Sequence, residues 1–192
     1  MRRLLIFGAL IILLFGGCRT KKPAVETFSA GVQPKNEYPG AKYSEPSTWL
    51  LGYFNPSQLS MPPHSEWFTK GYDEYQPDRS VMEKLTLLDK NDLTIQIVMG
   101  TWCPDSRREV PRFMRVLYQL KFPSENVTFI GVDNSKVAPI GDFDKFNIQR
   151  VPTFIFLKNK VEAGRIIENP VTSLEQDMLN ILNRNENNKN QE

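Results

Sequence analysis

The sequence predicts an α/β domain built around a central mixed β-sheet. Apolar runs at 93–99 and 127–132 are typical of strands buried on both faces, and shorter runs at 154–157 and 161–168 predict two more strands. Helical patterns precede and separate the first two strands, and one further helix follows the last. We expect this order of elements to form a three-layer sandwich with helices on both faces of the sheet.

Length and charge fit one ordinary domain with appendages. The chain has 192 residues, with 24 basic and 22 acidic side chains and a formal net charge of +2. Without Arg2 and Arg3, which lie in a segment expected to be removed, 22 basic side chains stand against 22 acidic ones. That balance offers no basic face, so no nucleic-acid partner is expected.

Residues 1–17 are typical of a secretory signal. A pair of arginines precedes an apolar segment at 4–15, which is too short to span a bilayer comfortably. Two glycines then lead to Cys18, which resembles the lipid-attachment cysteine of bacterial lipoproteins, although Phe15 stands where leucine is usual. We expect Cys18 to carry lipid and to hold the domain outside the cytoplasm, on the periplasmic or outer-membrane face of a bacterial membrane. An uncleaved N-terminal anchor is the alternative.

Two segments separate the signal from the predicted domain. Residues 18–46 are rich in Lys, Pro, Gly, Ser and Glu without apolar periodicity, and predict a flexible membrane tether. Residues 47–77 form an aromatic-rich N-terminal extension with a predicted helix at 65–75, for which Ser65 is a possible cap. We interpret its rings as packing against the core, with the lining of a groove beside Cys103 as the alternative. The rings at helical spacing are Trp67, Phe68, Tyr72 and Tyr75.

The first half of the predicted domain, 78–184, alternates helix and strand. An amphipathic helix at 78–90, with Asp78 or Ser80 at its start, leads into the first buried strand. A second helix follows at 107–120, and Pro111 inside it is expected to kink it, because proline lacks an N–H and crowds the preceding turn.

The second half supplies a hairpin and a last helix. After the second buried strand, 133–147 predicts a turn and a short helical piece. The two later strands pair as a hairpin around a Lys-Asn-Lys turn. Ser173 and Gln176 form a capping box for a helix to about Arg184, and a polar tail at 185–192 follows.

The junction between the first buried strand and the second helix carries the candidate nucleophile. Trp102, Cys103, Pro104, Asp105 and Ser106 follow one another there. The first N–H groups of a helix point outward with the positive end of its dipole, which favours the reactive thiolate form of Cys103. We expect the Ser106 hydroxyl and N–H to donate hydrogen bonds to that thiolate. The predicted catalytic set is Cys103 with Trp102, Pro104 and Ser106.

Over 78–184 the chain resembles the thioredoxin-like superfamily. The cysteine turn is similar to the family's W-C-x-x-C motif, and Pro111 lies eight residues after the cysteine, where the family has its helix proline. Val151, Pro152 and Thr153 resemble the family's cis-proline loop. The resemblance implies a thioredoxin-like three-layer sandwich in which this loop faces the active cysteine and binds an extended substrate through its backbone.

The chain departs from thioredoxin at two linked positions. Ser106 stands in place of the resolving cysteine, and Ile97 in place of the family's buried aspartate. With Cys18 lipidated, Cys103 is the sole thiol and forms no intramolecular disulfide. The resemblance then implies monothiol exchange, in which Cys103 forms a mixed disulfide that an external thiol resolves.

Two classes of function remain open at this point. The first is a membrane-tethered thiol–disulfide oxidoreductase whose partners are protein thiols or disulfides, or a low-molecular-weight thiol. The second is a non-catalytic binding or scaffold module that holds an extended segment in the groove beside the proline loop. In both cases we expect a monomer.

No cofactor or metal is expected. His64 is the single histidine and lies in a proline-rich loop, so it pairs with Cys103 only if that loop folds over the turn. One free cysteine and one histidine are too few for a metal cluster. The sequence has no glycine-rich phosphate loop, and a nucleotide cofactor is therefore not implied.

Overall fold

The computed structural model describes residues 45–189, with side chains to residue 184. The predicted signal at 1–17, the lipidation site Cys18 and nearly all of the tether at 18–46 lie outside the described residues. Among the described helices, none combines the length and apolar character needed to cross a bilayer.

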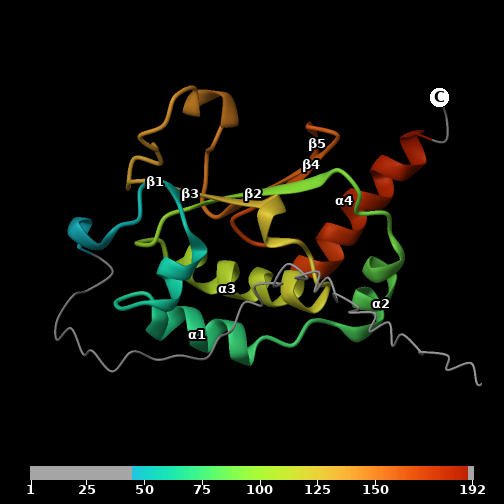
Figure 1. Cartoon of the computed structure of the whole chain (residues 1–192), viewed down its shortest axis with the longest axis horizontal. Coiled ribbons are helices and arrows are strands. Elements are labelled where there is room, and N and C mark those ends of the chain that lie inside the picture. The colour runs from blue at the N-terminus through green and yellow to red at the C-terminus, as the bar shows by residue number, and fades with distance from the viewer. Residues whose placement is uncertain (1–44, 190–192) are drawn as a thin grey trace, which may run out of the picture.

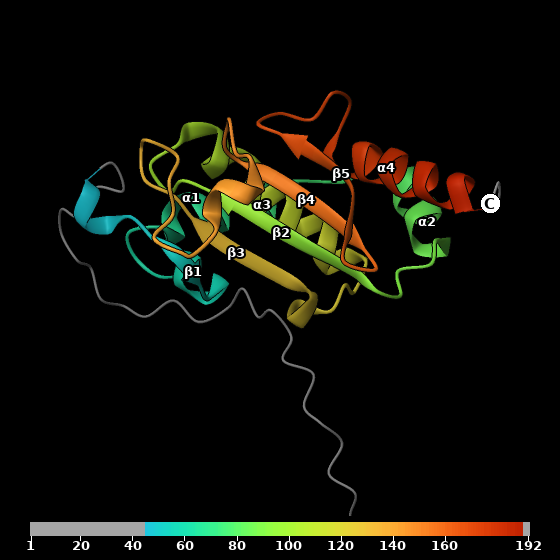
Figure 2. The same cartoon turned by 90° about the horizontal axis from the view of Figure 1, so that it is seen from above.

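A mixed sheet forms the middle of the molecule (Figures 1 and 2). Its strands are β1 (Gly52–Phe54), β2 (Leu93–Met99), β3 (Val127–Gly131), β4 (Thr153–Lys158) and β5 (Val161–Ile167), in the spatial order β1-β3-β2-β4-β5. β2 and β3 run parallel, and the other neighbouring pairs run antiparallel. The predicted α/β architecture and the β4–β5 hairpin are confirmed.

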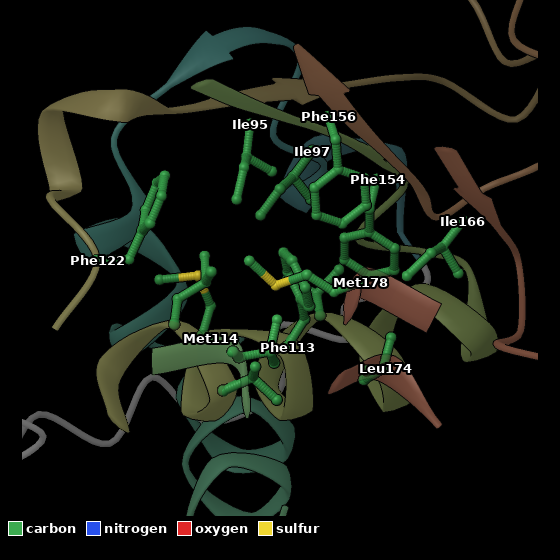
Figure 3. Close-up of a cluster of buried hydrophobic side chains, with 14 of the residues drawn as sticks. Ile95, Ile97, Phe113, Met114, Phe122, Phe154, Phe156, Ile166, Leu174 and Met178 are labelled. Atoms are coloured by element: carbon green, nitrogen blue, oxygen red, sulfur yellow. The ribbon is translucent and has the colours of Figure 1, made fainter. Parts of the chain in front are cut away.

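The α-helices gather on one face of this sheet. They are α1 (Ser65–Glu74), α2 (Arg79–Leu87), α3 (Pro104–Gln119) and α4 (Leu174–Lys189). Figure 1 shows α1, α2 and α3 beneath the sheet. Side chains from all four helices join one buried cluster with the strands. Figure 3 labels members of this cluster from α3, α4 and the strands. Phe113 of α3 is fully buried there, with its ring centroid 4.6 Å from that of Phe154 on β4.

A loop covers the opposite face. The segment 132–152 between β3 and β4 supplies this cover, and its only helical element is the 3-10 helix η4 (Phe143–Phe146). Asp142 and Asn147 flank η4 in left-handed conformations, which stops it from extending into an α-helix. The third layer, predicted to be helical, is therefore a loop with one short 3-10 turn. The second buried cluster beneath it includes Val98, Ile130, Ile155, Cys103, Ala138 and Val151.

The starts of two helices differ in how well they were predicted. Asp78 caps α2 as predicted, because its Oδ1 accepts a hydrogen bond from Val81 N at 3.0 Å. Ser65 as a cap for α1 is wrong: Ser65 is already the first helical residue, and His64 occupies the cap position without a side-chain bond. The turn before α1 is itself wound, since Ser65 N donates to Met61 O at 3.0 Å.

The other two helices are longer than predicted. α3 begins at Pro104 rather than Arg107, in a first turn where proline is tolerated because its missing N–H has no helical partner. Ser173 Oγ accepts from Gln176 N at 3.2 Å, which is half of the predicted capping box at the start of α4. That helix continues past Arg184 to Lys189, so part of the predicted tail at 185–192 is helical.

The N-terminal extension packs against the domain, as interpreted from its rings. Tyr72 joins the helical cluster, with Trp67, Phe68 and Tyr75 packed against it. α1 lies very close to α3, because a Cβ added at Gly71 would be 2.7 Å from Cγ of Pro111. The extension also contributes β1, which was not predicted and which adds an edge to the sheet beside β3.

Candidate functional site

Cys103 lies where β2 passes into α3. It occupies the N-cap position of α3, and its backbone N–H donates to Gly100 O at 2.9 Å, which closes the turn between strand and helix. The thiol is free and only 6 % exposed. A cysteine so placed meets the positive end of a 16-residue helix dipole, the environment in which thiolate chemistry is favoured.

The loop before β4 meets the sulfur of this cysteine. The Cys103 thiol donates a hydrogen bond to Val151 O at 3.2 Å, across 48 residues of sequence. The Val151–Pro152 peptide bond is cis, and Pro152 is buried. Thr153 is buried as the first residue of β4, and its hydroxyl donates to Arg150 O at 2.7 Å. The structure therefore brings the predicted loop and the predicted nucleophile together.

Ser106 is placed differently from the expectation. Its hydroxyl oxygen accepts a hydrogen bond from Gly100 N at 3.3 Å, and the side chain is fully buried. The Cys103 side chain receives no capping hydrogen bond from α3, so the expected donation from Ser106 to the sulfur is absent here. Ser106 instead ties the first turn of α3 back to the end of β2. Pro104 lies exposed at the first position of the helix.

The Trp102 indole is fixed by a hydrogen bond to the covering loop and by its contact with Gly100. Its Nε1–H donates to Val132 O at 3.0 Å, where the covering loop begins. The indole lies directly over Gly100, because a Cβ there would be 2.5 Å from the ring. Glycine is therefore required at position 100, because any side chain there would collide with the Trp102 ring.

The arginines beside the turn bind groups within it. The Arg107 guanidinium donates to Trp102 O at 2.7 Å and to Thr101 O at 3.4 Å. Arg108 pairs with Asp105 and the buried Glu109, and the Glu109 contact is the main reason that its pKa is raised. Arg108 also reaches Asn169 in the loop after β5. Basic and acidic side chains beside the cysteine turn therefore neutralise one another in ion pairs.

His64 is not brought to Cys103. It is 3 % exposed, its ring meets Trp67 edge-on with centroids 5.9 Å apart, and the backbone of Thr48 is its hydrogen-bond partner. Burial lowers its pKa below the ordinary value. Among the described residues, no group of His, Cys, Asp and Glu side chains is arranged to hold a metal ion.

An open hollow of about 520 Å³ lies within the covering loop, at 135–148. Its lining includes Ala138, Ile140 and Phe143, which also belong to the cluster around Cys103. The rim carries Asp142, which pairs with Lys145. This loop therefore offers a recess of mixed polar and apolar lining on the same face as the thiol.

The sequence prediction missed three contributors to the site. Arg107 binds the backbone carbonyls of Thr101 and Trp102. Thr101 accepts a hydrogen bond from Leu50 N at 3.4 Å, and Trp49 lies against Trp102 with ring centroids 6.1 Å apart. The sequence carries no signal for these contacts except that 49–54 is apolar, because both join the extension to a distant turn.

Among known proteins, one curated sequence and several solved structures are similar to part of this chain. No protein-family model matches the sequence. A curated protein described as thioredoxin H-type, from Oryza sativa subsp. indica, is 31 % identical over 68 residues, which is 35 % of this chain. The chain spans 51 % of the length of that curated relative. The match shows thioredoxin-like homology over this region.

The solved structures with partial similarity to this chain include two thioredoxins. A protein of unknown function from Pseudomonas aeruginosa has a TM-score of 0.44 at 14 % identity, covering 64 % of this chain and 81 % of that one. Thioredoxin O2 from Arabidopsis thaliana, in the oxidized state, has a TM-score of 0.37 at 25 % identity, covering 54 % and 84 %. A mutant thioredoxin from Halobacterium salinarum NRC-1 has a TM-score of 0.33 at 10 % identity, covering 57 % and 86 %.

Proposed function

We propose that the chain carries out thiol–disulfide exchange through Cys103 alone. The observation that carries the proposal is the Cys103 sulfur at the start of α3, held 3.2 Å from Val151 O, with the hydroxyl of Ser106 where a second thiol would stand. The sequence has two cysteines, and Cys18 is the predicted lipidation site directly after the predicted signal at 1–17. The substrates are protein thiols or disulfides, or a low-molecular-weight thiol.

The exchange needs two displacements at sulfur. The thiol proton now directed at Val151 O is lost, and the thiolate attacks one sulfur of a substrate disulfide. The substrate S–S bond breaks, a Cys103–substrate disulfide forms, and the other substrate sulfur leaves as a thiolate. An external thiolate then attacks the mixed disulfide, which regenerates Cys103 and leaves the substrate sulfur bonded to the external thiol. In each step one S–S bond breaks and one forms, so the chain, the substrate and the external thiol together undergo no net oxidation or reduction.

A counting experiment tests the single-thiol cycle. Two full-length proteins are treated with a chromogenic aromatic disulfide. One carries Cys18→Ser alone, and the other carries both Cys18→Ser and Ser106→Cys. We expect the first protein to release one coloured thiol per chain and to remain as an adduct until an external thiol is supplied. Ser106→Cys should release two, because a second thiol in the same turn resolves the adduct. Absence of adduct formation at Cys103 would refute the proposal.

The proposed setting is extracytoplasmic and membrane-tethered. The arginine pair, the apolar segment at 4–15 and the Gly-Gly-Cys sequence ending at Cys18 support it. Metabolic labelling with a fatty acid should mark the native chain and leave Cys18→Ser unlabelled. Label retained by the variant would contradict lipidation at this cysteine.

The second candidate is a binding module without turnover. The observation that favours it is the low exposure of the Cys103 thiol, which is nearly buried and already hydrogen-bonded to Val151 O. The binding surface is then the groove beside the proline loop at 151–153, together with the recess at 135–148, whose lining shares Ala138, Ile140 and Phe143 with the cluster around Cys103. Cys103→Ala separates the two functions: partner capture that survives the substitution supports binding, and loss of capture supports exchange.

A further inference from the structure

The N-terminal extension packs directly against the cysteine turn and the end of β3. At Gly131, the last residue of β3, an added Cβ would be 1.9 Å from Leu50 O, so two backbones touch with no side chain between them. Leu50 N–H donates to Thr101 Oγ1 at 3.4 Å, and Thr101 is fully buried. The segment preceding β1 therefore has a fixed place against the turn.

The Trp102 ring contacts three described neighbours. Trp49 of the extension lies against Trp102 with the ring planes tilted by 49° and the centroids 6.1 Å apart. Val132 O accepts the Trp102 indole N–H at 3.0 Å, and Gly100 lies beneath the ring. Of these neighbours, only Trp49 comes from outside the thioredoxin-like segment 78–184. Removing the Trp49 ring would leave Trp102 free to tilt into the vacated space.

We propose that Trp49 is a positioning residue for Cys103. It acts through Trp102, whose orientation fixes the turn in which Cys103 N–H is bonded to Gly100 O and Cys103 Sγ is directed at Val151 O. The inference rests on the proposed exchange function, because the group it positions is the exchanging thiol. The site is accordingly built from two parts of the chain, and the extension sets the reactivity of a cysteine more than fifty residues away.

The test compares three variants of the full chain carrying Cys18→Ser. Trp49→Ala removes the ring, Trp49→Phe keeps an aromatic face, and Tyr53→Ala removes a ring from β1 that is 62 % exposed. Each protein is assayed at a temperature where circular dichroism shows it fully folded. The measurements are the rate of mixed-disulfide formation and the pH profile of Cys103 alkylation by iodoacetamide.

We expect Trp49→Ala to slow mixed-disulfide formation by about fivefold, the scale of one aromatic contact. Trp49→Phe should recover most of that rate, and Tyr53→Ala should leave it unchanged. The pH at which alkylation reaches half its maximum should move in Trp49→Ala only, since general loosening would change the rate equally at every pH. An unchanged rate and profile in Trp49→Ala, or no recovery in Trp49→Phe, would overturn the inference.

The two readouts separate this inference from the proposed function. If the parent protein forms no mixed disulfide, the exchange function fails, and the alkylation profiles still decide whether Trp49 positions Cys103. If the parent protein exchanges well and Trp49→Ala behaves identically in both assays, the function stands and the positioning role is refuted.

Discussion

Gly131→Ala tests whether the close approach of the extension is essential to the fold. The added Cβ would lie 1.9 Å from Leu50 O and 2.6 Å from Leu50 C. A tolerable carbon–oxygen contact is about 3.3 Å, so the Leu50 backbone must retreat by more than about 1 Å. Such a retreat pulls β1 away from β3, with which it is paired at three positions beginning at Gly52 and Gly131.

The cost follows from the contacts that this movement removes. The Leu50–Thr101 hydrogen bond and part of the β1–β3 ladder are lost, together with the Trp49–Trp102 ring contact. At roughly 1 kcal/mol for each of two or three hydrogen bonds and about 0.5–1.5 kcal/mol for the ring pair, the free energy of unfolding should fall by about 3 kcal/mol.

Gly141→Ala is the matched control, because nothing lies within 4 Å of a Cβ added there. Urea unfolding followed by circular dichroism measures both variants against the parent. We expect Gly141→Ala to stay within about 0.5 kcal/mol of the parent. If Gly131→Ala also stays within that range, the extension is not held by backbone contact as described.

Two further predictions concern buried ionisable groups. Burial lowers the pKa of His64 below its ordinary value of 6.5, so protonation favours the unfolded chain: stability is retained above about pH 6.5 and falls as the pH drops below it. Between pH 7.5 and about pH 5.5, the free energy of unfolding in urea should therefore fall less for His64→Gln than for the parent. Equal falls in the two proteins would contradict the role of His64 burial in this pH dependence. Glu175, 3 % exposed, accepts hydrogen bonds from Tyr75 OH at 2.7 Å and Asp78 N at 3.0 Å. Glu175→Ala should cost about 2–4 kcal/mol in the same assay because both donors lose their acceptor, whereas the exposed Glu74→Ala should cost little; similar values for the two would refute this role.

The sequence predicted best those elements whose signal is local. β2 was found because five of its seven residues are apolar and most of them are buried, although Thr94 in it is exposed and Gln96 is half-buried. The start of α2 was found because Asp78 caps it through a residue three positions away. β1 was missed because it has three residues and one exposed side chain, and its pairing is decided by the distant Gly131.

The site shows the same division between local and distant contacts. The cysteine turn could be read from its place between strand and helix, whereas the Val151 contact, 48 residues away, was expected only through a family resemblance. Ser106 was assigned to the sulfur because both lie in one turn, but the buried N–H of Gly100 competes for its hydroxyl. Trp49 could not be assigned at all, since its partner depends on how the extension crosses the sheet.

The sheet separates the two hydrophobic clusters by face, so residues around one cluster can be changed independently of the other. All four α-helices contribute to one cluster, while Cys103 and Val151 belong to the other, beneath the loop at 132–152. Substitutions and length changes in that loop alter what surrounds the thiol without disturbing the helical half of the core. The surroundings of Cys103 and the helical core are therefore two separate targets for redesign.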